Sequence, residues 1–178
     1  MKNQTYHSVK WLLVFIMGLF LLPATAQAAV KIYDCNGQEL KPATSALARN
    51  HTRRAEKALS EINKTKCLPT RDLNYINNHV KSQGVQIKMD CSANPDCGQA
   101  PHGSNTILIP RNYRSMRGGC GCEEATILHE MLHSYAMIPD TGWGHKKIEG
   151  CETKCTAGIR NCQRYPPPTG GGQPCDCI

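Results

Sequence analysis

Two patterns of hydrophobic and polar residues predict the elements in the first two thirds of the chain. Residues 44–62 are rich in polar side chains, but apolar ones recur about one turn apart, which predicts a helix. A second, shorter helix is predicted over residues 71–80. In Val85–Asp90 apolar and polar residues alternate strictly, as they do in a half-buried strand. Residues 106–109 form an apolar, β-branched run ended by Pro110, which predicts another strand, at the edge of a sheet.

The clearest helical pattern covers residues 123–137, and Pro139 ends it. Its broad apolar face is made by Ile127, Leu128, Met131, Leu132 and Tyr135. A last helix is predicted over residues 145–157. The order helix, helix, strand, strand, helix, helix predicts a small α+β fold.

The first 28 residues have the composition of a signal peptide. Lys2 and Lys10 give it a positive start, an uncharged apolar run covers residues 11–22, and Ala26 and Ala28 frame a cleavage site. The apolar run is too short for a membrane span, which needs about 20 residues. We therefore expect an exported protein, periplasmic or secreted, with no stable membrane anchor after cleavage.

Eleven cysteines, all after residue 28, point to the same compartment. In an exported chain this density predicts a disulfide framework, and the odd number leaves at least one cysteine free or paired with another molecule. A bridge from Cys120 or Cys122 to Cys151 or Cys155 would join the last two predicted helices. Structural zinc on cysteines is the alternative. We expect one domain over residues 29–164 and an irregular tail rich in Pro, Gly and Cys over residues 165–178.

The charge of the chain does not indicate a nucleic-acid partner. Removing Lys2 and Lys10 from the formal net charge of +7 leaves about +5 for the mature chain. Its basic residues are dispersed and lack the dense patch with aromatic side chains that nucleic-acid binding requires. They are interpreted as a solvated surface.

The residues with the clearest chemistry are His129, Glu130 and His133, in the sequence HEMLH. Positions four apart share one face of a helix, so the two imidazoles can converge on one metal ion. Zinc binds neutral imidazole and lowers the pKa of a bound water towards 7. Glu130, beside the first ligand, is then the candidate general base.

A catalytic zinc site needs a third protein ligand, and three residues compete for this role. His145, Glu149 and Glu152 fall on one stripe of the predicted last helix. A metzincin would need a histidine near Pro139 instead, and there is none.

With these residues the chain resembles the zincin superfamily of metallopeptidases. The stretch HEMLHSYAM, a short loop and then Gly144 and His145 are similar to SprT-like proteases and to small bacterial toxin-type metallopeptidase domains. The resemblance implies peptidase activity, a zincin-like domain with a short sheet packed on the active-site helix, and His145 as third ligand. It covers less than a quarter of the chain. In a gluzincin-type site the ligand would be Glu152.

Zincins also have a strand beside the active-site helix, to which substrate adds by backbone pairing. The resemblance gives this role to residues 106–109. Tyr135, His102 and Tyr113 are candidate donors to the oxyanion that develops on the substrate.

The function predicted from the sequence is therefore that of a secreted zinc metallopeptidase. Its partners would be a protein or peptide substrate and, for a toxin, an inhibitor or immunity protein. The main alternative is a non-catalytic, disulfide-rich secreted binding module. Such a module has no use for the intact Glu130. Zinc scavenging is a weaker alternative, because the seven histidines are scattered.

Overall fold

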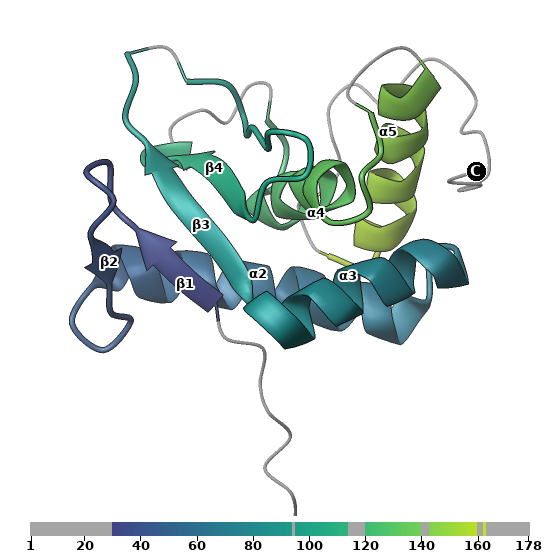
Figure 1. Cartoon of the computed structure of the whole chain (residues 1–178), viewed down its shortest axis with the longest axis horizontal. Coiled ribbons are helices and arrows are strands. Elements are labelled where there is room, and N and C mark those ends of the chain that lie inside the picture. The colour runs from purple at the N-terminus through teal and green to yellow at the C-terminus, as the bar shows by residue number, and fades with distance from the viewer. Residues whose placement is uncertain (1–29, 94, 114–119, 140–142, 160–161, 163–178) are drawn as a thin grey trace, which may run out of the picture.

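The computed structural model describes residues 30–93, 95–113, 120–139, 143–159 and 162, and for residues 143–145 the backbone only. Over these ranges the chain is an α+β protein, as predicted, with four helices and a four-stranded mixed sheet of which two strands were predicted. In Figure 1 the sheet lies to the left and α5 to the right, with α4 between them and α2 and α3 along the lower side. The predicted signal peptide and the tail over 165–178 lie outside the described residues.

The sheet has the order β2-β1-β3-β4. Strand β3 (Val85–Asp90) has the predicted bounds and pairs in parallel with β1 (Val30–Tyr33) on one side and with β4 (Thr106–Pro110) on the other. Strand β2 (Glu39–Leu40) pairs antiparallel with β1. Strands β1 and β2 are not predicted from the sequence, because four and two residues are too few to give a periodic signal.

Helices α2 (Ala46–Thr65) and α3 (Thr70–Gln83) follow the predicted periodicities and extend a few residues further. Ser45 caps α2, since its side chain accepts a hydrogen bond from the backbone of Ala48 at 3.2 Å. Residues Ala48, Ala55 and Ile62 of α2 are completely buried. Helix α2 packs against β1 and against α4.

Helix α4 (Glu123–Ser134) is buried along its whole length, and it packs against α2, α3, β4 and α5 (Trp143–Thr156). It is shorter than the predicted helix over 123–137. The chain leaves the helix after Ser134, Met137 takes a left-handed φ of 57°, and the backbone N–H of Ile138 donates to the carbonyl of Leu132 at 3.1 Å. This turn brings the Ile138 carbonyl back to the helix.

Disulfides join the described elements, as the number of cysteines predicted. The four bridges within the described residues are Cys35–Cys91, Cys67–Cys155, Cys97–Cys120 and Cys122–Cys162. Cys151 is also disulfide-bonded. The expected bridge from Cys120 or Cys122 to Cys151 or Cys155 is wrong, because Cys120 binds Cys97 in the segment before β4, Cys122 binds Cys162, and Cys155 binds Cys67 between α2 and α3.

None of the described helices has the length and hydropathy that crossing a membrane requires.

Candidate metal centre

The imidazoles of His129 and His133 meet inside the protein. They lie one turn apart on α4, and their Nε2 atoms are 3.1 Å from each other. The two residues are only 6% and 3% exposed. Two imidazole nitrogens at adjacent corners of a tetrahedral zinc site are about 3.3 Å apart, given Zn–N distances of about 2.0–2.1 Å. The pair therefore already has nearly the separation that zinc requires.

In each ring, whether Nδ1 carries the hydrogen determines whether Nε2 presents a lone pair. His133 Nδ1 lies 2.8 Å from the carbonyl oxygen of Ile138, and His129 Nδ1 lies 3.0 Å from Glu152 Oε2. A carbonyl or carboxylate oxygen only accepts, so both Nδ1 atoms carry a hydrogen and donate it. In neutral rings both Nε2 atoms then present lone pairs, and at 3.1 Å these repel unless a cation lies between them.

Glu152 occupies a different place from the one expected of a third ligand. This residue of α5 is 3% exposed, and one of its carboxylate oxygens binds Nδ1 of His129, the nitrogen on the far side of the ring from Nε2. A carboxylate in this position fixes the tautomer and orientation of a metal-binding histidine. The geometry favours Glu152 as the residue that positions His129.

The other two candidate ligands also lie on α5. Glu149 is partly exposed in the middle of the helix. His145 is in the first turn of α5, and its side chain lies outside the described part of the structure. Helices α4 and α5 contact each other, and Glu152 of α5 reaches His129.

Glu130 is 6% exposed and lies under the segment that precedes β4. A Cβ atom on Gly98 would lie 3.0 Å from Glu130 Oε1 and 2.5 Å from Thr126 Cγ2. Real Cβ atoms essentially never approach another atom to 2.5 Å, so only glycine fits where this segment crosses α4. No role of Gly98 is predicted from the sequence, because only the fold brings the loop before β4 to α4.

The N-terminal end of α4 is held by ion pairs with α2. Glu123 Oε1 contacts Nδ1 of His51, and both residues are buried. Glu124, completely buried, accepts from Arg54 Nη1 at 2.7 Å and lies 3.5 Å from Lys57 Nζ. The hydrogen bond with Glu124 raises the pKa of Arg54 above its ordinary value. These carboxylates therefore anchor the helix, in addition to their favourable position at its N-terminus.

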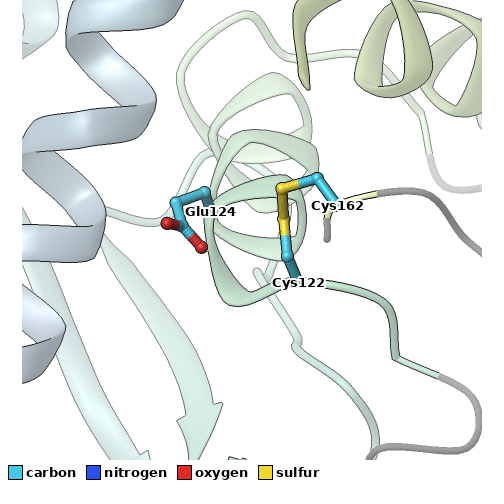
Figure 2. Close-up of side chains that lie close together, drawn as sticks. All are labelled: Cys122, Glu124 and Cys162. Atoms are coloured by element: carbon cyan, nitrogen blue, oxygen red, sulfur yellow. A yellow bond between two sulfur atoms is a disulfide. The ribbon is translucent and has the colours of Figure 1, made fainter. Parts of the chain in front are cut away.

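Figure 2 shows a second group of residue types that can bind metal, Cys122, Glu124 and Cys162, whose ligand atoms lie within 4.8 Å of one another. The two cysteines form a disulfide, and zinc binds thiolates rather than disulfide sulfurs. The Glu124 carboxylate pairs with Arg54 of α2. In the oxidised protein this group is a structural crosslink beside an ion pair.

The three candidate oxyanion donors are engaged within the protein. The buried Tyr113 hydroxyl donates to the carbonyl of Cys120 at 2.8 Å. Tyr135 points its hydroxyl to the Asn105 carbonyl at 3.5 Å, and burial raises its pKa to about 12. His102 lies at the surface with Nε2 3.1 Å from the carbonyl of Met137. Tyr113 and Tyr135 thus help to pack the fold.

Comparison of the chain with protein-family models, with curated proteins and with solved structures found no match. What the protein does is therefore inferred from the residues and contacts described above.

Proposed function

We propose that the protein is an exported zinc metallopeptidase with a zincin-like, disulfide-stapled domain. The observation that supports this best is the pair of Nε2 atoms 3.1 Å apart, each on a ring whose Nδ1 is held by an acceptor. Two buried imidazoles with lone pairs turned towards each other suit a divalent cation. Nitrogen ligands on a helix, with a carboxylate behind one of them, are typical of zinc.

His129 and His133 would bind the metal through Nε2, and His145 is proposed as the third ligand. Zinc, when bound, supplies a water of lowered pKa and polarises the substrate carbonyl. Glu130 follows His129 directly, and its carboxylate accepts the proton of the attacking water and then donates it to the leaving amine. Burial of Glu130 under Gly98 restricts its side chain and excludes bulk solvent on that side.

The disulfides support the proposed location. The four described bridges and the disulfide of Cys151 need an oxidising compartment, which for this chain means export to the periplasm or beyond. The proposed partners are a protein or peptide substrate and, if the peptidase acts as a toxin, an inhibitor or immunity protein.

The alternative function, a disulfide-rich binding module, requires a different explanation of the histidine pair. One proton shared between His129 and His133 would also allow their contact. Such a pair would bind no zinc, and it would give no role to the buried Glu130. Metal content therefore separates the two functions directly.

The experiment is zinc analysis of the oxidised mature protein, wild type beside His133→Ala and His145→Ala, followed by incubation with an unfolded protein substrate. We expect about one zinc per chain in the wild type, loss in both variants, and cleavage by the zinc-loaded wild type only. Zinc retained in His145→Ala would assign the third ligand elsewhere. No zinc after reconstitution would overturn the proposal in favour of the binding module.

A further inference from the structure

The carboxylate of Glu124 has one oxygen that the ion pairs of α4 do not use. Oε1 accepts from Arg54 and lies near Lys57, both on α2, whereas Oε2 is buried with no hydrogen-bond partner among the described residues. Glu124 is completely buried, so bulk water does not compensate for the missing bond. In Figure 2 one oxygen of this carboxylate points towards the blue helix α2, and the other lies on the side of Cys122. A buried negative acceptor without a partner suits a cation.

Two sulfur atoms lie beside this carboxylate. The ligand atoms of Cys122, Glu124 and Cys162 are all within 4.8 Å of one another, and Cys162 is only 4% exposed. In a tetrahedral zinc site two thiolates at about 2.3 Å from the metal lie about 3.8 Å apart. The three side chains therefore already have nearly the spacing that a shared zinc ion requires, once the bond between the two sulfurs is open.

The position of Cys122 favours the thiolate that zinc would bind. Cys122 is the N-cap of α4, and its Sγ accepts from the backbone N–H of Ala125 at 3.3 Å. The N-terminal end of a helix stabilises a negative sulfur, and so do basic side chains nearby, here Arg54 and Lys57 beside Glu124. Cys122 is also partly exposed, so a small reductant can reach the bridge from this side.

We propose that Cys122, Glu124 and Cys162 form a second metal site, which binds zinc only when the disulfide between the two cysteines is reduced. Opening the bridge takes two electrons and two protons, which a dithiol supplies as it forms its own disulfide. Zinc then displaces the two thiol protons into solvent, with Glu124 Oε2 as third ligand and water in the fourth position. Oε1 keeps its bond to Arg54 and so holds the carboxylate in place.

The second metal site is independent of the histidine pair and of the proposed peptidase function. In the oxidised protein the disulfide joins Cys162 to the start of α4. In the reduced protein zinc would make the same connection. The thiolates that bind zinc are not free to attack an oxidant, so zinc would also delay closure of the bridge.

The first test opens the bridge with a water-soluble phosphine, which is oxidised to its oxide by the oxygen of water while the two sulfurs gain the two hydrogens. Folded His133→Ala protein, chosen to disable the histidine pair, is partly reduced, given zinc or no metal, alkylated briefly and mapped by mass spectrometry. We expect zinc to lower alkylation of Cys122 and Cys162 about tenfold or more. Cys35 and Cys91 belong to no such ligand group within the described residues and should react alike with and without zinc. Equal protection of both pairs, or none, would overturn the proposal.

Glu124→Gln, in the same His133→Ala background, tests the third ligand. The amide keeps the volume of the side chain but loses the charge, and we expect the zinc affinity of the reduced protein to fall about tenfold or more, measured by competition with a chelator. Glu123→Gln is the matched control, because it also removes a buried carboxylate that pairs with α2, through His51, but lies outside the cluster. Equal affinities of the two variants would overturn the role of Glu124 and with it the proposed site.

Cobalt in place of zinc shows directly whether sulfur binds the metal. Cobalt bound to thiolates has a charge-transfer absorption in the near ultraviolet, whereas cobalt on histidine and carboxylate alone does not. We expect this absorption in the reduced protein, and its absence in the oxidised protein and in the reduced double variant with Cys122→Ser and Cys162→Ser. An absorption of equal strength in the double variant would assign the metal to other cysteines and overturn the proposal.

Discussion

The two ends of α4 bury polar side chains in different electrostatic arrangements. At the N-terminal end, Glu123 contacts His51 and Glu124 contacts Arg54, so acids face bases. At the C-terminal end, His129 and His133 face each other through identical nitrogens. The first arrangement is complete with the residues present and stabilises the packing of α4 on α2. The second brings two like groups together, and such groups are compatible with burial when a cation joins them. The two ends are equally buried, and only the chemistry of the facing atoms separates the ion-paired end from the end proposed to bind metal.

The strongest test of this comparison is Glu130→Gln at the end proposed to be catalytic. The amide keeps the volume of the carboxylate but cannot accept a proton from water. We expect the rate of peptide hydrolysis to fall by about a thousandfold or more, with zinc content and Tm close to those of the wild type. The measurements are steady-state kinetics, metal analysis and thermal unfolding. Activity within tenfold of the wild type would exclude Glu130 as the general base.

Glu124→Gln is the matched substitution at the structural end. It leaves Arg54 without its charged partner, and we expect the free energy of unfolding to fall by about 2–3 kcal/mol. Denaturant unfolding measures this loss. Zinc affinity and kcat of the folded variant should stay within about threefold of the wild type. A large loss of kcat in the folded protein would mean that the two ends are not separate in function.

Glu152→Ala tests the contact behind His129. Removal of the carboxylate frees Nδ1 and the orientation of the ring, and we expect zinc affinity to fall about 10- to 100-fold. Competition with a chelator of known affinity measures this change. Complete loss of zinc at saturating concentration would instead identify Glu152 as a ligand.

The smallest expected effect concerns His79, which stacks on Tyr135 just after α4, with ring centroids 3.8 Å apart. Burial lowers the pKa of His79, so the folded state disfavours the protonated ring. The contribution of the neutral ring is thus fully present above the ordinary pKa of 6.5 and is lost as the pH falls below it. His79→Phe keeps a stacked ring without titration. The Tm of the wild type relative to this variant should fall on the order of 1 °C from pH 7.5 to pH 5. A difference that is constant with pH would contradict this explanation.

The sequence predicts the parts of this molecule that depend on local periodicity. The bounds of β3 and the face that joins His129 to His133 follow from spacing, since neighbours in a strand or helix determine which side a residue faces. The Ile138 carbonyl that holds His133 could not be predicted, because the pattern extended α4 to residue 137, beyond its end at Ser134. The position of Glu152 on Nδ1 depends on how α5 docks against α4. That docking is a tertiary contact with no local signal.

The disulfides also determine in which cellular compartment the described fold has all its crosslinks. One bridge ties Cys97, in the loop before β4, to Cys120 just ahead of α4, another holds Cys122 at the cap of that helix, and a third fastens α5 to Cys67 between α2 and α3. The surroundings of the histidine pair, on α4 and α5, are thus crosslinked by bonds that exist only under oxidising conditions. In a reducing cytosol the same chain lacks these three crosslinks. For the proposed peptidase, the absence of these crosslinks would keep the chain inactive in the cell that makes it until it has been exported.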